Sequence, residues 1–428
     1  MTTVLLGAIP FEGHVAPMLG VARRFTELDI RVRFLTGAAF ADRVRATGAE
    51  FLPLPAEADQ LESDVVRDID ERRLSGTAAL RENLDRVFIR PAAAQYRALL
   101  AAIAEEPVDA VLTESGFSGS AGLLHTPGHP PVVVCGILPL GVGSRDVAPF
   151  GLGLAPDASP LGRIRNRVLA WAMQHVLFRE NQRSADAAMR EMTGHDMGGF
   201  FLDWPRYADA IAQFTVPSFE YPRSDGPAKL RFFGPVSRLA PSDHARPSWW
   251  HDLDGGTPVV HVTQGTVANE NLGELIRPTL DALAEEDVLV VVSTGGKPVA
   301  ELGELPANAR AAEMLPYAEL MPRVDVFVTN GGYGGLHYAL ERGVPIVVAG
   351  DTEDKPETAA RVAWAGVGVN LRTGTPTASA IRDAVREVLA DDRYARASAR
   401  IGAEIQASSG VDGLADLIRS LSPRATLA

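Results

Sequence analysis

The order of apolar strands and helices along the chain predicts an α/β protein with two Rossmann-like, doubly wound domains that face each other across a cleft. Two observations support this fold class. Short apolar strands alternate with amphipathic helices before and after a stretch rich in proline, glycine and serine at residues 214–248. The length of 428 residues also exceeds the roughly 250–300 residues at which a single hydrophobic core stops growing.

An N-terminal domain is expected over residues 1–213. Its predicted strands are short apolar runs bounded by proline or glycine, at 3–7, 31–35, 108–113 and 132–135. Residues 16–28 predict a helix with Pro17 in its first turn, where the missing N–H costs nothing. Residues 161–192 predict one long helix with apolar residues at helix spacing, among them Ile164, Val168 and Val176. Core packing is the expected role of Trp171, His175 and Phe178, and the alternative is that they line an acceptor pocket.

Residues 214–248 are interpreted as the end of this domain and an interdomain linker. A C-terminal domain is expected over 249–408, followed at 409–428 by a helix that could pack back on the N-terminal domain. Its predicted strands are 259–263, 288–293, 312–315, 326–329 and 346–348. Its predicted helices are 272–284, 333–342, 356–364, 378–390 and 395–406.

Composition excludes several classes of function. A net charge of −13 argues against a nucleic-acid-binding surface, because phosphate backbones need basic stripes. The single cysteine, Cys135, excludes an intramolecular disulfide and fits a reducing compartment. The chain enters a strand without a basic targeting segment, and its longest apolar run, 131–142, is too short to span a bilayer. We therefore expect a cytoplasmic protein without stable membrane insertion.

The most informative motif is the glycine-rich stretch Thr329–Gly335, which follows an apolar strand and opens a helix. Its glycines allow a ligand to approach the backbone closely, and Gly334 is expected to need a positive φ. Free N–H groups in the first helical turn would then face an anion such as a pyrophosphate. The alternative is a glycine-rich turn that only reverses the chain, since such fingerprints are weak alone.

Charged residues follow the next strand, in the segment Asp351–Lys355. Carboxylates at this edge of the sheet can accept hydrogen bonds from sugar hydroxyls, and a lysine can form an ion pair with a phosphate. The alternative is a solvated turn whose acidic residues favour the start of the next helix.

A histidine follows the first strand, in the segment Gly13–Pro17. An imidazole in this loop would face the cleft, where it is suited to remove a proton from a hydroxyl near neutral pH. The alternative is a loop histidine that caps the following helix. His125 and His129 are separated by proline and glycine, so they cannot share a helix face as metal ligands. We expect no metal and no cofactor.

The stretch 321–368 resembles the nucleotide-sugar signature of family 1 glycosyltransferases, which include plant secondary-metabolite enzymes and bacterial antibiotic enzymes. Within it, Val324–Gly335, Gly343–Pro345 and Asp354 fall at the spacings of that family. Val262–Thr266 resembles the family's turn beside the diphosphate. The resemblance extends over nearly the whole chain and implies the GT-B architecture, with the acceptor in the N-terminal domain and the donor in the C-terminal domain.

The resemblance also implies site residues. Those placed at the substrates are Gly13, Thr263, Gly265, Thr266, Leu315, Asn330, Gly331, Gly332, Tyr333, Gly334, Gly335, Asp354 and Lys355. The implied reaction is inverting transfer from a UDP- or dTDP-sugar to a hydroxyl of a small, largely apolar acceptor such as a natural-product aglycone. His14 is the implied base, and Glu114, where aspartate is usual, is its orienting partner. The chain would act as a monomer or homodimer.

The chain departs from the family pattern at four donor positions. Asn330 stands where histidine is usual, and Tyr338 where a ribose-binding glutamate is usual. Met314 replaces a base-stacking tryptophan, and Lys355 a glutamine. The donor's base and sugar are therefore open. The alternatives are a nucleotide-sugar 2-epimerase or glycan phosphorylase of the same architecture, or a glycosyltransferase-like auxiliary protein without catalytic activity.

Overall fold

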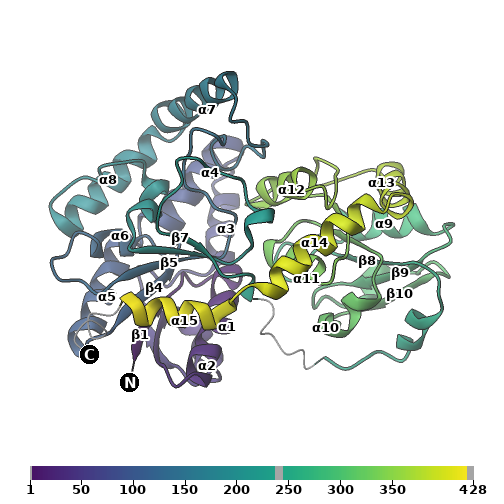
Figure 1. Cartoon of the computed structure of the whole chain (residues 1–428), viewed down its shortest axis with the longest axis horizontal. Helices are drawn as coiled ribbons and strands as arrows, with labels where there is room; N and C mark the ends of the chain where they lie inside the picture. Colours follow the sequence, from purple (N-terminus) through teal and green to yellow (C-terminus); the bar gives the residue numbers. More distant parts are fainter. Residues whose placement is uncertain (1, 237–243, 422–428) are drawn as a thin grey trace.

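Two parallel β-sheets, each covered by helices, form the two halves of the molecule (Figure 1). The computed structural model describes residues 2–236 and 244–421. The first sheet has seven strands in the order β3-β2-β1-β4-β5-β6-β7, and the second has six in the order β10-β9-β8-β11-β12-β13. Every pairing is parallel. Two doubly wound α/β halves confirm the predicted fold class.

The strands of the first sheet are β1 Thr3–Gly7, β2 Arg31–Thr36, β3 Glu50–Pro53, β4 Ala110–Glu114, β5 Val132–Gly136, β6 Ala210–Gln213 and β7 Leu230–Phe232. Those of the second sheet are β8 Val259–Thr263, β9 Leu289–Ser293, β10 Ala309–Ala312, β11 Val326–Thr329, β12 Ile346–Val348 and β13 Gly368–Asn370.

The helices of the first half are α1 Glu12–Glu27, α2 Ala41–Arg45, α3 Glu62–Glu71, α4 Gly76–Leu84, α5 Ala92–Glu105, α6 Gly119–Leu123, α7 Pro160–Ala172 and α8 Arg179–Thr193. The remaining helices are α9 Ile276–Leu283, α10 Tyr317–Leu320, α11 Tyr333–Glu341, α12 Lys355–Trp364, α13 Ala378–Ala390, α14 Arg393–Ala407 and α15 Gly410–Leu421. Because both faces of each sheet are covered, apolar cores lie on both sides of the central strands.

Helix α1 begins at Glu12, four residues earlier than predicted. The chain turns into the helix directly after Phe11, whose backbone is extended. His14 therefore lies in the first helical turn and not in a loop. Pro17 is the sixth residue of the helix, so its missing N–H leaves the carbonyl of Gly13 without an intrahelical donor. The prediction that this proline occupies the first turn was wrong.

The single helix predicted over 161–192 is two helices, α7 and α8, separated by a π-helical turn at Met173–Leu177. The apolar residues at helix spacing are exposed: Ile164, Val168 and Val176 are 56%, 59% and 62% accessible to solvent. Of the three residues expected in the core, Trp171 and His175 are exposed and only Phe178 is buried. The buried residues of α7 are instead Gly162 and Asn166. Helix α7 thus rests on the protein through small and polar residues, at the outer edge of the first half (Figure 1).

Strand β10 was predicted at 312–315 but lies at Ala309–Ala312. It is an edge strand with half-exposed residues, so no apolar run marks it. Leu315 lies beyond the strand end and is 2% exposed, because it packs into the core of the second half.

The last helix, α15, returns to the first half (Figure 1). Its residues Leu414 and Ile418 belong to the same buried cluster as strand β1. At the return point, the N–H of Gly410 donates a 2.8 Å hydrogen bond to the carbonyl of Phe233, just before the chain enters the second half. Part of the predicted linker, 237–243, and the end of the predicted last segment, 422–428, lie outside the described residues.

Candidate active site

A cleft with a volume of about 1060 Å³ lies between the two halves, at the carboxyl ends of the central strands. The first half contributes His14 from the first turn of α1 and Phe88 from the segment before α5. The second half contributes Thr266 after β8, Gly334 after β11 and Asp354 after β12. Loops that follow parallel strands thus meet across one cleft.

His14 is paired with a buried carboxylate. Its Nδ1 lies 2.8 Å from Oε2 of Glu114, which ends strand β4 and is fully buried. The carboxylate is fixed by two backbone donors: Ile9 N–H at 3.1 Å on Oε1 and Gly116 N–H at 2.6 Å on Oε2. A carboxylate can only accept, so Nδ1 carries the proton and Nε2 keeps its lone pair.

Burial and charge act in opposite directions on His14. Burial lowers the pKa of the imidazole, but the carboxylates of Glu114, Glu62 and Asp354 together raise it more, and Glu114 contributes most of this rise. The net result is a pKa above the ordinary value for histidine. The imidazole can therefore hold a proton at a pH where an isolated histidine would be neutral.

The glycine-rich stretch forms a tight turn and the start of α11. Gly331 has φ +93°, and a Cβ there would approach a methyl carbon of Val348 to 2.9 Å. Gly334 lies inside the helix and has no positive φ, so the expectation of strain at that residue was wrong. Nothing lies within 4 Å of a Cβ built on Gly332 or Gly334. The first turn of α11 therefore presents its N–H groups to open space in the cleft.

The Asn330 side chain holds the turn after β8. Its Nδ2 donates to the carbonyl of Gln264 at 2.6 Å and to that of Ala268 at 3.2 Å. Both amide hydrogens are thus used inside the protein. The amide positions the loop that contains Gly265, whose φ is +75°, and Thr266.

The carboxylate of Asp354 lies in the cleft at the start of α12. Burial raises its pKa to about 6, with a further rise from Glu353 and an opposing effect of Lys355. The ammonium of Lys355 lies 2.5 Å from Oε2 of Glu353 and 3.1 Å from Oγ1 of Thr352. Asp354 and His14 influence each other's charge across the cleft, so the two halves approach each other here.

Most of the predicted site residues line this cleft: Gly13, His14, Gly265, Thr266, Asn330, Gly332, Tyr333, Gly334, Gly335, Asp354 and Lys355. Four do not. Thr263 and Leu315 are buried beneath it, Gly331 lies under α12, and Glu114 lies behind His14.

The segment 57–76 was expected to shape the acceptor pocket, but Glu62 was not singled out within it; Glu62 begins α3 and lines the cleft. Burial raises its pKa, and Glu353 in the second half raises it further. Its acidic neighbourhood is typical of a solvated helix start, so no signal in the sequence distinguishes it. Within residues 2–236 and 244–421, no group of three or more His, Cys, Asp or Glu side chains could hold a metal ion. The same residues include no helix long and apolar enough to cross a bilayer.

Comparison with known proteins agrees with this geometry. The family model for the erythromycin biosynthesis protein CIII-like C-terminal domain matches residues 277–416. The chain is 42% identical over 421 residues to 4'-demethylrebeccamycin synthase of Lentzea aerocolonigenes, covering 98% of this chain and 99% of that protein. It is 34% identical over 446 residues to UDP-glycosyltransferase 2 of Phaeomoniella chlamydospora, covering 98% and 95%.

Solved structures share the fold. The glycotransferase of kitacinnamycin superposes with a TM-score of 0.73 at 24% identity, covering 99% of both chains. Spinosyn rhamnosyltransferase SpnG complexed with thymidine diphosphate superposes with a TM-score of 0.68 at 17% identity, covering 98% of this chain and all of that one. Fold and cleft define a GT-B glycosyltransferase. The chain belongs to the glycosyltransferase family that contains these natural-product enzymes and the UDP-glycosyltransferases, as its resemblance implied.

Proposed function

We propose that the protein transfers a sugar from a nucleotide diphosphate to a hydroxyl of a small, largely apolar acceptor, with inversion at the anomeric carbon. One observation carries this proposal: the His14–Glu114 pair and the open first turn of α11 face the same cleft from opposite halves. A base and an anion-binding helix start are the two parts that such a displacement needs.

In the proposed reaction, Nε2 of His14 takes the proton of the acceptor hydroxyl while its oxygen attacks the anomeric carbon. The bond from that carbon to the diphosphate oxygen breaks, and the nucleotide diphosphate leaves with the bonding electrons. Glu114 stabilises the imidazolium that forms. The N–H groups at the start of α11, with Thr266, stabilise the negative charge on the departing diphosphate.

The first half offers the space for an apolar acceptor. A second cavity of about 190 Å³ is lined by apolar side chains such as Phe88, Phe150 and Trp204. Phe88 and Phe150 also line the cleft, so the two spaces adjoin. We propose an aglycone as acceptor, and either UDP or dTDP as the nucleotide. Relatives named UDP-glycosyltransferase support UDP, and the SpnG complex with thymidine diphosphate supports dTDP.

The buried free thiol of Cys135 supports a cytoplasmic setting.

Release of nucleotide diphosphate, measured with and without acceptor, tests the proposal. A transferase releases it in step with acceptor addition. A 2-epimerase interconverts sugars without net release, and an auxiliary protein does neither alone. A thermal-shift panel of nucleotide diphosphates and their sugars identifies the donor, because a ligand that binds only the folded state raises its stability.

The pH profile of transfer tests the base. A general base must be unprotonated, so kcat/KM should rise with pH through the pKa of His14, which lies above the ordinary histidine value. Glu114→Gln removes a charge that raises the pKa of His14. The acidic limb of the kcat/KM profile should therefore move to lower pH in this variant, while kcat falls. Asp354→Asn is the control, because it removes a group with a pKa of about 6 whose charge adds less than Glu114 to the rise in the His14 pKa; the limb should move to lower pH by less than in Glu114→Gln and should remain visible. A limb that disappears in the control would assign the titration to Asp354.

Asp354 is proposed to bind hydroxyls of the transferred sugar. Asp354→Ala should therefore weaken binding of the nucleotide sugar by about 10–150-fold, the usual worth of a hydrogen bond to a charged group. Binding of the free nucleotide diphosphate should stay almost unchanged. Calorimetry with both ligands measures the difference, and equal weakening of both would contradict the sugar assignment.

The proposed reaction needs no metal, because the start of α11 neutralises the phosphate charge. Turnover should therefore survive exhaustive treatment with EDTA. Turnover that is lost on chelation and restored by Mg²⁺ or Mn²⁺ would overturn this part of the proposal.

A further inference from the structure

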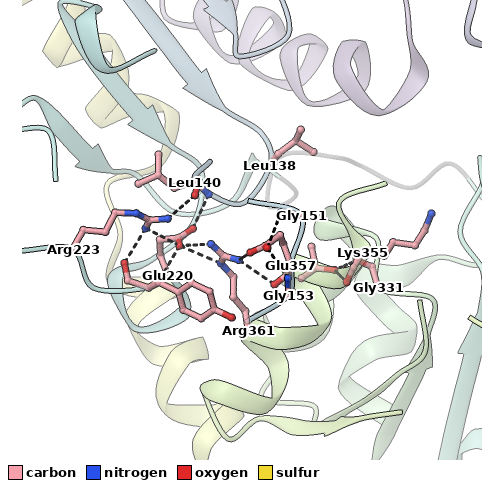
Figure 2. A network of polar contacts seen from close by, with 12 residues as sticks. Leu138, Leu140, Gly151, Gly153, Glu220, Arg223, Gly331, Lys355, Glu357 and Arg361 are labelled. Carbon is pink, nitrogen blue, oxygen red and sulfur yellow. Dashed lines mark hydrogen bonds and ion pairs between the residues drawn. The ribbon is translucent and has the colours of Figure 1, made fainter. Parts of the chain in front are cut away.

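A network of four buried charged residues lies where the two halves meet (Figure 2). Glu220 and Arg223 follow β6 in the first half, and Glu357 and Arg361 lie on α12 in the second. Their side chains are at most 5% exposed. The proposed reaction uses none of them.

Arg361 is the centre of the network. Its Nη2 and Nε donate to Oε1 of Glu220 at 2.6 and 3.1 Å, and its Nη1 donates to Oε2 of Glu357 at 2.9 Å. Its guanidinium also lies 4.1 Å from the ring centre of Tyr221. Burial raises the pKa of the Glu220 carboxyl, but Arg361 and Arg223 lower it more, so Glu220 is charged. The two carboxylates and two guanidiniums balance in charge.

The network holds both ends of one loop, residues 140–153. At its start, the Leu140 N–H donates to Oε2 of Glu220 at 2.9 Å, and its carbonyl accepts from Nη2 of Arg223 at 2.6 Å. At its end, the N–H groups of Gly151 and Gly153 both donate to Oε1 of Glu357 at 2.9 Å. Arg361 thus joins the residue that holds one end of the loop to the residue that holds the other.

This loop faces the apolar space of the first half. Leu140, Val142 and Phe150 line the smaller cavity, and Phe150 and Leu152 line the cleft. We call residues 140–153 the acceptor loop.

The same stretch of α12 also contacts the donor side. Oγ1 of Thr358, next to Glu357, donates to the carbonyl of Gly331 at 2.6 Å. Asp354 and Lys355, which line the cleft, are separated from Glu357 only by Pro356. One turn of helix therefore contacts the acceptor loop through Glu357 and the glycine-rich donor turn through Thr358.

Stability alone does not account for four buried charges. Desolvating an ion pair costs several kcal/mol per ion, and well-packed apolar residues are often as stabilising in its place. Apolar residues could not accept hydrogen bonds from the N–H groups of the two glycines. Glycine has no side chain, so the loop can be held at these residues only through its backbone.

We propose that Glu357 is a positioning residue for the acceptor: with Arg361 and Glu220 it fixes the acceptor loop at a set distance from the donor turn. The proposal rests on the proposed function, in which an acceptor occupies the space beside this loop. Glu357 acts through the loop and does not touch the reacting atoms.

Glu357→Gln tests the proposal. An amide has one oxygen and one NH₂ group, so it can accept from the two glycines or from Arg361, but not from both. We expect the acceptor KM to rise about tenfold or more, as expected from losing a charge-assisted hydrogen bond. The Kd for nucleotide diphosphate should change less than about twofold. Hydrogen–deuterium exchange of residues 140–153 should accelerate, and this readout does not depend on activity.

Gly153→Ala tests the same contact from the other side. Gly153 has φ +59°, and a Cβ there would lie 2.8 Å from the carbonyl oxygen of Pro356 on α12. The added methyl group pushes the loop away from the helix without removing a charge. It should raise the acceptor KM and the exchange rate as Glu357→Gln does, and the double variant should show less than the product of the two effects.

Arg33→Gln is the matched control. Arg33 is equally buried, 2.6 Å from Glu105, and lines neither cavity. It should lower stability without raising the acceptor KM. The proposal is overturned if Glu357→Gln and Gly153→Ala keep wild-type acceptor KM and exchange, or if Arg33→Gln raises acceptor KM as much. If the wild-type protein transfers no sugar, the proposed function fails, and exchange of the acceptor loop alone decides this inference.

Discussion

His14→Ala is expected to lower kcat by roughly 10²–10⁴-fold, the usual contribution of a positioned general base. The variant leaves Glu114 without the imidazole that it orients and leaves the acceptor hydroxyl without a proton acceptor. The donor residues lie in the other half, so the Kd for nucleotide diphosphate should not change. Steady-state kinetics at saturating substrates and calorimetry with the nucleotide measure the two effects.

His175→Ala is the control for this variant, because His175 is exposed and does not line the cleft. It should retain wild-type turnover. A His14→Ala variant that also turns over at the wild-type rate would exclude His14 as the base. A loss of nucleotide affinity in the same variant would indicate that the fold of the cleft had changed.

Gly334→Val is expected to weaken binding of nucleotide diphosphate on the order of 100-fold or more. The Gly334 position opens to the cleft in the first turn of α11, so a branched side chain would stand in front of the N–H groups. Losing two hydrogen bonds to a charged ligand costs about 1.5–3 kcal/mol each. The intrinsic preference of the helix is a smaller effect, since valine and glycine both disfavour helices by less than about 1 kcal/mol.

Gly334→Ala provides the graded comparison. Its single methyl group meets no protein atom within 4 Å, so the fold should be retained and the loss of affinity should be smaller than with valine. Calorimetry on both variants, with circular dichroism to confirm folding, measures the effect. Normal binding of nucleotide diphosphate by the valine variant would place the diphosphate elsewhere.

Strands β1, β8, β11 and β12 were predicted at their observed bounds, whereas β4 was predicted at 108–113 and lies at 110–114. The four matching strands are rich in apolar residues because both of their faces are covered. The strands β7, β10 and β13 lie toward the sheet edges and are half-exposed, so their sequences carry no continuous apolar run. Local pattern thus identifies most of the buried parallel strands, but it misses those at the margin and also the short buried strand β6.

Residues that line the cleft were predictable where the segment directly follows one strand, as for His14 at the start of α1 and the turn at Gly331–Gly335. They were not predictable where a side chain turns to another part of the protein. The side chain of Asn330 could donate a hydrogen bond to a ligand, but its amide donates to two backbone carbonyls of the protein instead. Glu357 and Arg361 have the spacing of a solvated ion pair on a helix surface, and only packing between the halves buries them.

The return of the last helix determines how the halves can move. The chain leaves the first half after Phe233 and re-enters it at Gly410, and the two residues share a backbone hydrogen bond. Both crossings therefore lie at one place and act as a single pivot. A rotation of the halves relative to each other would therefore pivot near this point, and to widen the cleft it would also have to break the contact between Glu220 and Arg361. Sliding of one sheet past the other would have to break this bond and pull α15 out of the core that it shares with β1.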